Sequence, residues 1–394
     1  MKFIFYYISI TLVFTSCVSD VKHQQKKNNT GYTKPSGDFK FRQISCGGYH
    51  TCGVRKDKSA WCWGAGNDGR LGYGEERNVM NPIQVKELEK NIYSVSAGYS
   101  HSCALTELGE VFCWGCGRDG QLGNDSFLTQ LVPVRVMFSD NTAVSLSLGE
   151  YHSCSLKKDG TIWCWGKNNF GQTGCEECTC KTPEKVNTSG KRMISVASGS
   201  RHTCAVSVEG KVLCWGDNSA SQLGTKDPKK TNTPVEVTGI PGKIVSIEVG
   251  EYHSCAKTES GNLWCWGTMK HRTSMIVKMT QPTIIKESKN VSLISSGYNH
   301  QCSIINNRLM CFGLNNYGQL GNKSTVDSSN PVEVNLPKKH IKSISCGKYH
   351  TCAVYNNGKT WCWGYNQDGQ LGNGSTQNTD TPSQVMIENV IRKN

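Results

Sequence analysis

The chain has 394 residues, a formal net charge of +13 and a charged fraction of only 19%, which together argue against an intrinsically disordered polyelectrolyte. Its 41 glycines are typical of an all-β protein rich in turns, and its scattered lysines, without interleaved aromatic residues, argue against nucleic-acid binding. The 21 cysteines indicate an oxidising compartment, unless they bind metal.

The N-terminal segment MKFIFYYISITLVFTSC has the features of a secretory signal peptide. Lys2 precedes an apolar run, 3–14, that is shorter than the roughly 20 residues needed to span a bilayer. The small residues before Cys17 resemble a bacterial lipobox, in which cleavage leaves a lipidated N-terminal cysteine. We therefore predict a signal peptide over 1–17 with Cys17 as the lipidation site. Phe14 replaces the usual leucine, so secretion without a lipid is the alternative.

The residues after Cys17 bear on location. Val18 stands where an aspartate marks inner-membrane lipoproteins of Gram-negative bacteria, so the resemblance implies the outer membrane. Residues 18–40 are polar and lack periodicity, which predicts a flexible tether. We expect an exported monomer, either secreted or held to the membrane by a lipid anchor only and facing the periplasm or the surface.

Seven copies of one motif follow the tether. One copy, HSCSLKKDGTIWCWG (152–166), places a histidine before two cysteines and ends in Trp-Gly. In each unit an alternating segment such as 92–98 precedes this hairpin, and a glycine-rich loop and a short strand such as 234–237 follow it. Four strands per unit, repeated seven times, predict an all-β fold: a seven-bladed β-propeller of four-stranded antiparallel blades.

The motif histidines lie 47 to 51 residues apart. They are His50, His101, His152, His202, His253, His300 and His350. The propeller is expected over 41–394, with repeats starting near 41, 92, 143, 193, 244, 291 and 341.

The loop after each hairpin carries a family resemblance. It reads WGAGNDGRLG (63–72), WGCGRDGQLG (114–123) and WGYNQDGQLG (363–372), with similar copies in three other units. With the G-x-x-H segment that precedes each hairpin, this pattern resembles the regulator of chromosome condensation repeat family over 41–394, which implies a seven-bladed propeller. Unit five departs from the pattern with WGTMKHRTSMIV (266–277), so its loop should differ in shape.

The paired cysteines flank the turn of each hairpin. Counting outward from the turn 158–160 puts Cys154 directly opposite Cys164. In unit six the turn is one residue shorter and Cys302 still faces Cys311, as a bridge between the strands requires. We predict one disulfide per blade, at Cys52–Cys62, Cys103–Cys113, Cys154–Cys164, Cys204–Cys214, Cys255–Cys265, Cys302–Cys311 and Cys352–Cys362. Zinc is the alternative, but no fourth ligand recurs, and we expect no metal and no cofactor.

Six cysteines remain. Cys46 and Cys346 occupy the same position in units one and seven, which are neighbours in a closed ring. We predict a ring-closing disulfide between them, with two free thiols lining the channel as the alternative. The other four, Cys116, Cys175, Cys178 and Cys180, lie in corresponding loops of units two and three. They are expected to form extra disulfides, with a metal site as the alternative.

No catalytic motif is apparent in the sequence. The repeated histidines are expected to bond to nearby turns, and the repeated tryptophans to pack between blades. We predict a non-enzymatic binding scaffold of the cell envelope that recognises a protein or an envelope component through loops on one face. The departures from symmetry mark the place: loop 175–180, Cys116 and loop 268–279. Family analogy leaves nucleotide exchange on a small GTPase, or inhibition of a secreted enzyme, as alternatives.

Overall fold

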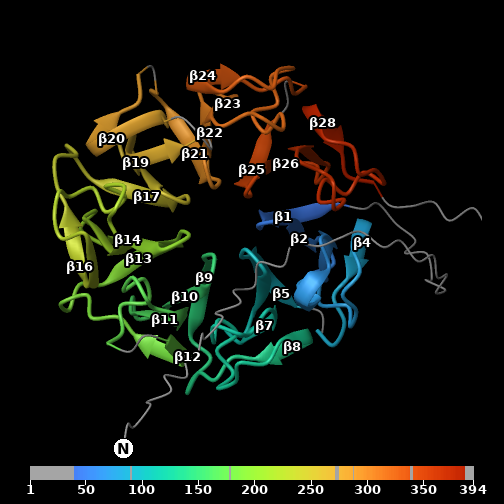
Figure 1. Cartoon of the computed structure of the whole chain (residues 1–394), viewed down its shortest axis with the longest axis horizontal. Coiled ribbons are helices and arrows are strands. Elements are labelled where there is room, and N and C mark those ends of the chain that lie inside the picture. The colour runs from blue at the N-terminus through green and yellow to red at the C-terminus, as the bar shows by residue number, and fades with distance from the viewer. Residues whose placement is uncertain are drawn as a thin grey trace, which may run out of the picture. The chain divides into compact units, whose positions relative to one another are not determined.

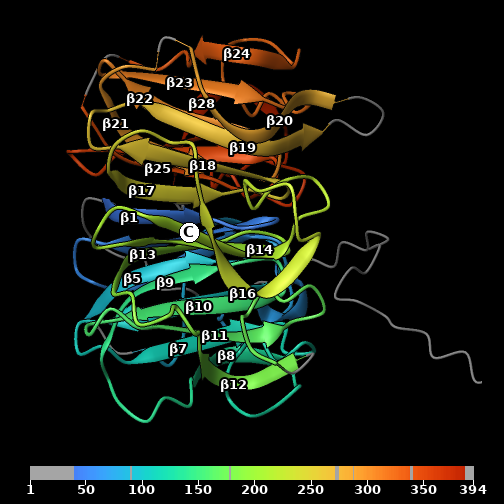
Figure 2. The same ribbon diagram turned by 90° about the vertical axis from the view of Figure 1, so that its left-hand side faces the viewer.

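The computed structural model describes residues 40–88, 91–176, 179–270, 275–286, 288–337 and 340–386. Within these ranges the strands form seven four-stranded antiparallel sheets around a common centre (Figure 1), which confirms the predicted seven-bladed β-propeller. The first strand of each blade lies nearest the centre and the fourth lies at the rim. Figure 2 shows the strands running between the two faces of the disc. No helix in the described ranges has the length and hydropathy needed to cross a membrane.

Each blade is built from one contiguous segment, and its strands are hydrogen-bonded in chain order. The first four blades contain β1 (Phe41–Cys46), β2 (His50–Arg55), β3 (Ala60–Gly64), β4 (Val79–Gln84); β5 (Ile92–Ala97), β6 (His101–Thr106), β7 (Val111–Gly115), β8 (Gln130–Arg135); β9 (Ala143–Leu148), β10 (His152–Lys157), β11 (Ile162–Lys167), β12 (Thr179–Lys185); β13 (Met193–Ser198), β14 (His202–Ser207), β15 (Val212–Asp217), β16 (Lys230–Val237).

The last three contain β17 (Ile244–Val249), β18 (His253–Thr258), β19 (Leu263–Lys270), β20 (Met275–Ile284); β21 (Val291–Ser296), β22 (His300–Ile305), β23 (Arg308–Gly313), β24 (Ser328–Glu333); β25 (Ile341–Cys346), β26 (His350–Tyr355), β27 (Thr360–Gly364), β28 (Thr379–Gln384). A short 3₁₀ turn, η1 (Asn67–Gly69), lies in blade one. The predicted signal peptide 1–17, its lipidation site Cys17 and the tether up to residue 39 lie outside the described residues, as does Cys178.

All seven predicted blade disulfides are present. In each blade the two cysteines are register partners on the second and third strands, as at Cys154 and Cys164. In blade six the register Cys302–Cys311 is kept across a two-residue turn, Asn306 and Asn307, with φ values of 50° and 63°. Positive φ at both positions is what a type I′ hairpin turn requires. The other bonded pairs are Cys52–Cys62, Cys103–Cys113, Cys204–Cys214, Cys255–Cys265 and Cys352–Cys362.

The motif histidines join each blade to the next. Nε2 of His152 lies 2.8 Å from Oγ1 of Thr203 in the following blade. That hydroxyl donates to the backbone carbonyl of Gln172, in the loop of the histidine's own blade, at 2.8 Å. Because the hydroxyl hydrogen is used on the carbonyl, the imidazole is the donor to the hydroxyl. The histidine therefore bonds to a hydroxyl of the next blade, and not directly to a nearby turn as we predicted. The hydroxyl, in turn, bonds to the loop of the histidine's own blade.

We call this chain of two hydrogen bonds, from histidine to hydroxyl to carbonyl, the hydroxyl relay. It occurs at six of the seven seams, as we call the junctions between neighbouring blades. It closes the ring between blades seven and one, where Nε2 of His350 donates to Thr51 at 2.8 Å and Thr51 donates to the carbonyl of Gln370 at 2.9 Å. The glycine that opens each G-x-x-H loop makes room for the ring. At Gly149, for example, a Cβ atom would lie 2.4 Å from Cε1 of His152.

The motif tryptophans fill the seams, as predicted. Seven hydrophobic clusters lie between neighbouring blades, and each contains the Trp or Phe that ends the third strand of the second blade. Most of these indoles also make a hydrogen bond: Nε1 of Trp114 donates to the carbonyl of Arg70 at 2.9 Å, the carbonyl that also accepts from Ser102. Trp215 differs, because its indole nitrogen has no hydrogen-bond partner among the described residues.

The predicted ring-closing disulfide is wrong, because Cys46 and Cys346 are both free and buried. Sγ of Cys46 lies within 4.8 Å of a ring nitrogen of His350 and of Sγ of Cys352, both in blade seven. Cys346 has the same relation to blade six. In a rotationally symmetric ring, equivalent side chains all point the same way around the ring. The thiol of Cys46 therefore points toward blade seven, while that of Cys346 points away from blade one, toward blade six. Burial raises the pKa of the Cys46 thiol to about 12, so it stays protonated at neutral pH.

Candidate binding surface at the mouth of the central channel

One face of the propeller carries most of the departures from symmetry. In an antiparallel blade, the loop between the first and second strands lies beside the loop between the third and fourth. The amide of Ala65, for instance, donates to the carbonyl of Tyr49 at 2.9 Å. The described parts of loop 175–180, Cys116 and the strand ends around 268–279 therefore belong to the same face as the G-x-x-H loops.

The extra cysteines of this face are oxidised. Cys175 and Cys180 form a disulfide across the loop before β12, and Cys116 is also disulfide-bonded. A disulfide sulfur is not a thiolate, so these three residues are not available as metal ligands. Cys178, the fourth predicted member, lies outside the described residues.

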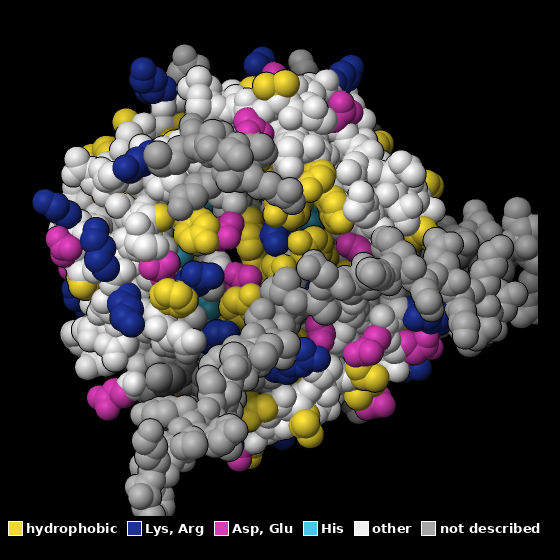
Figure 3. Space-filling model, viewed as in Figure 1, with side chains coloured by type: hydrophobic (Ala, Val, Ile, Leu, Met, Phe, Trp, Pro, Cys, Tyr) yellow, Lys and Arg dark blue, Asp and Glu magenta, His cyan; other side chains and the backbone are white. Residues whose placement is uncertain are grey.

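A narrow cavity of about 70 Å³ lies on the axis of the ring. It is lined by the loop glycines of all seven blades and by Tyr99, Tyr298 and Lys348. Figure 3 shows hydrophobic and charged side chains gathered around the central hollow of one face. The mouth of this channel combines aromatic rings, an ammonium group and carboxylates, and these are the groups with which a surface recognises another molecule.

Six half-buried or buried tyrosines form what we call the tyrosine rim. Their rings are in contact in pairs: the centroids of Tyr317 and Tyr365 lie 4.9 Å apart, those of Tyr49 and Tyr99 lie 5.6 Å apart, and Tyr349 lies 5.1 Å from Tyr317. Most of these pairs are tilted or edge-to-face, which is the favoured geometry of aromatic rings. The rim consists of Tyr49, Tyr99, Tyr298, Tyr317, Tyr349 and Tyr365.

The ammonium of Lys348 lies inside the rim. It is 4.8 Å from the ring centroid of Tyr99 and 5.0 Å from that of Tyr49, and it donates to both hydroxyls, at 3.3 and 3.1 Å. It also lies over the rings of Tyr298 and Tyr349, at 5.3 and 5.1 Å. Attraction to the ring faces holds the charge in place, and the tyrosines keep the pKa of Lys348 above its usual value although burial acts to lower it.

Two glutamates complete the mouth. Glu150 accepts a hydrogen bond from Ser200, and Glu251 accepts one from Asn299 at 2.8 Å. Burial raises the pKa of Glu251 above its usual value, and the charge on Glu150 acts in the same direction. The mouth therefore has a cationic centre beside an acidic sector, which gives a docking partner both charge and shape to match.

These residues were not predicted from the sequence, although the sequence contains a signal for them. A tyrosine stands at one of the two middle positions of the G-x-x-H segment in six of the seven units, as in GGYH (47–50) and GKYH (347–350). These segments are adjacent on one face of a closed ring, and four of their tyrosines belong to the rim: Tyr49, Tyr99, Tyr298 and Tyr349. Tyr317 and Tyr365 come from the neighbouring loops after the third strands.

Comparison with known proteins identifies the family. Residues 16–303 match the RCC1-like domain, and residues 306–354 and 357–392 match the regulator of chromosome condensation (RCC1) repeat. The ultraviolet-B receptor UVR8 of Arabidopsis thaliana is 30% identical over 354 residues, which cover 87% of this chain and 69% of the receptor. The mitochondrial RCC1 domain-containing protein RUG3 of the same plant is 30% identical over 84% of this chain and 66% of its own length.

Solved structures agree with this assignment. Prp20p of Saccharomyces cerevisiae, described together with its binding to Gsp1p and histones, superposes with a TM-score of 0.74 at 25% identity, covering 84% of this chain and 86% of that one. The shared repeats, the fold and the relatives all lead to one conclusion: the chain belongs to the regulator of chromosome condensation repeat family.

Proposed function

We propose that this protein is a non-enzymatic binding scaffold of the cell envelope, which holds a protein partner at the tyrosine rim. The observation that carries the proposal is the rim itself. Tyrosines supply large contact area at low entropic cost, and they are enriched where proteins bind one another. Prp20p, which shares the fold, is described with the proteins that it binds, and this supports a binding role here.

The state of the histidines supports a role without catalysis. The 2.8 Å separation of His50 Nε2 and Ser102 Oγ is that of a catalytic pair. Both side chains are fully buried, however, and the serine hydroxyl donates to the carbonyl of Arg70, so it is not poised to attack a substrate. The pair therefore serves to join two blades.

The disulfides support export. Seven hairpin bridges in one chain require an oxidising compartment for their formation. The signal-peptide pattern of residues 1–17 would deliver the chain there, and a lipid on Cys17 would hold the propeller at the membrane. Labelling of cells with a radioactive fatty acid tests the anchor. The chain should take up label and the C17S variant should not, whereas equal labelling of both would rule out Cys17 as the lipid site.

Site-specific crosslinking on intact cells tests the partner. A photoreactive phenylalanine analogue at Tyr317 or Tyr365 is expected to capture the same polypeptide, while the analogue at Tyr93, an exposed tyrosine on β5, should not. The captured protein, once purified, should bind the wild-type chain about tenfold or more tightly than the Y317A/Y365A variant. Equal capture from Tyr93, or no capture from the rim, would refute the proposal.

A further inference from the structure

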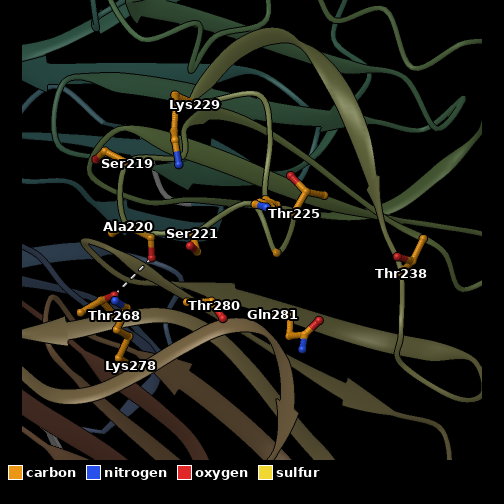
Figure 4. Close-up of a pocket in the computed structure, with 12 residues that line it drawn as sticks. Ser219, Ala220, Ser221, Thr225, Lys229, Thr238, Thr268, Lys278, Thr280 and Gln281 are labelled. Atoms are coloured by element: carbon orange, nitrogen blue, oxygen red, sulfur yellow. Dashed lines mark hydrogen bonds between the residues drawn. The ribbon is translucent and has the colours of Figure 1, made fainter.

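A second cavity, of about 800 Å³, lies between blades four and five on the same face as the rim. Its walls are the loop after β15, which includes Ser219–Lys229, and the paired ends of β19 and β20. Figure 4 shows Lys229 approaching it from blade four and Lys278 from blade five, with a hydrogen bond of 3.2 Å from Thr268 to the carbonyl of Ala220 at its edge. The cavity adjoins the repeat that departs most from the family pattern.

Ser221 explains why the seam is open here. Five other blades have glycine at this loop position, with positive φ, and the outermost strand of the next blade packs directly onto it. A Cβ atom at Gly318 would lie 2.4 Å from Cα of Asp380, and one at Gly369 would lie 2.7 Å from Cα of Met80. Ser221 has φ of 64° and carries a Cβ, so β20 cannot approach as closely. A serine kept in a strained conformation that maintains a cavity indicates a functional position.

Most of the lining side chains are polar, and three of them are lysines. Besides Lys229 and Lys278, Lys226 contributes an ammonium group, and none of the described lining residues is acidic. None of these three lysines takes part in an ion pair among the described residues. The hydroxyl of Thr225 is buried and has no hydrogen-bond partner among the residues that the structure describes. An unused buried hydroxyl beside three unpaired ammonium groups is suited to the oxygens of a tetrahedral anion.

We propose that this cavity binds a ligand carrying two or more phosphate groups. Its volume admits a ligand larger than one phosphate, and lysines on both walls allow two anionic groups to be held at once. Lysine binds phosphate as a point charge, so the site selects charge more than shape. The ligand is either a soluble polyphosphate or the headgroup of a membrane lipid. This site is separate from the tyrosine rim, so each proposal can fail without the other.

Two probes distinguish the sources. Calorimetry with inorganic tripolyphosphate measures the soluble form, and cosedimentation with phosphatidylcholine vesicles containing cardiolipin, whose headgroup has two phosphates, measures the lipid form. The K229Q/K278Q variant should bind its probe about tenfold or more weakly than the wild type. The K158Q/K342Q variant loses the same charge from exposed lysines outside the cavity and should bind as the wild type does.

The T225V variant separates binding from folding. Its melting temperature should equal or exceed that of the wild type, because the hydroxyl has no internal partner to lose, while its affinity should fall several-fold. Tripolyphosphate binding without vesicle binding identifies a soluble ligand, and vesicle binding that tripolyphosphate displaces identifies a headgroup. Binding of neither probe, or equal weakening in both lysine variants, would overturn the proposal.

Discussion

Gln301 occupies the position in blade six from which a hydroxyl should accept a hydrogen bond from His253 of blade five, and Nε2 of His253 has no hydrogen-bond partner within the described part of the chain. The amide of Gln301 instead donates to the carbonyl of Cys302 at 3.0 Å. The change follows from blade five, whose loop lacks the Gln or Arg residue that supplies the accepting carbonyl at the six other seams. The indole of the next blade has also been lost, and Phe312, which has no N–H to satisfy, stands in its place.

This relation makes the hydroxyl relay testable with a matched pair of variants. The T203V substitution keeps the shape of the side chain but leaves His152 without an acceptor, so it should lower the free energy of unfolding by about 1–3 kcal/mol. The Q301T substitution supplies His253 with a hydroxyl and should not lower it. Urea denaturation measures both, and an unchanged T203V midpoint would show that the relay does not stabilise the ring.

The aromatic residue that ends the third strand offers a second pair. In W114F the carbonyl of Arg70 loses one of its two donors, and the free energy of unfolding should fall by about 1 kcal/mol. In F312W an indole N–H is buried at the one seam that lacks the matching loop segment, so a loss of about 1–3 kcal/mol is expected. A stabilised F312W would mean that blade five supplies an acceptor after all.

Acid should unfold the protein steeply. Burial lowers the pKa of His152 and His202 to about 3, far below the ordinary value of 6.5, and the other motif histidines shift in the same direction. The unfolded chain therefore takes up protons first. The stability that depends on neutral histidines is complete above pH 6.5 and is lost as the pH falls from 6.5 toward 3, by up to about 1.4 kcal/mol per pH unit for each histidine.

One buried carboxyl opposes this trend. Burial raises the pKa of Glu248 to about 8, so its contribution is complete below its ordinary pKa of 4.5 and is lost as the pH rises through 8. Seven histidines outweigh one glutamate, so acidification from pH 6.5 to 5 should destabilise the fold. The E248S variant introduces the serine that most other blades have at this position. It should still lose stability as the pH falls below 6.5, but it should no longer lose stability as the pH rises through 8. Urea denaturation midpoints, measured from pH 5 to above pH 8, report both changes in stability. A midpoint that does not fall between pH 6.5 and 5 would contradict the neutral state assigned to the histidines.

The cysteines divide into two classes that chemistry can separate. Removal of a blade bridge in C154A/C164A should lower the free energy of unfolding by about 2–3 kcal/mol, as expected for so short a loop. Alkylation of the denatured, unreduced chain should modify Cys46 and Cys346 and none of the blade cysteines. If Cys46 were recovered unmodified, the result would contradict the free thiols of the structure and would support the ring-closing disulfide.

Much of the fold was predictable because it depends on local periodicity. Strand alternation places Cys154 opposite Cys164, and a one-residue deletion in the turn of blade six preserves the pairing. The predicted disulfide between Cys46 and Cys346 was wrong because equivalent positions in neighbouring blades indicate how far apart two cysteines lie, but not the direction in which each thiol points. The partner of each histidine, the tyrosine rim and the cavity beside Ser221 all form between blades, where residues about fifty positions or more apart meet. Repeat periodicity predicts that blades are neighbours but not which side chains touch.

The one-way direction of the relay affects how such a ring can change its number of blades. If blade two were duplicated in place, Ser102 of the copy would meet the original His101, and His101 of the copy would meet Ser153. Both junctions would be satisfied at once, without a compensating mutation. A duplicate of blade six would instead set its Gln301 against His300, so gene duplication is chemically easier among the first blades than beside the fifth.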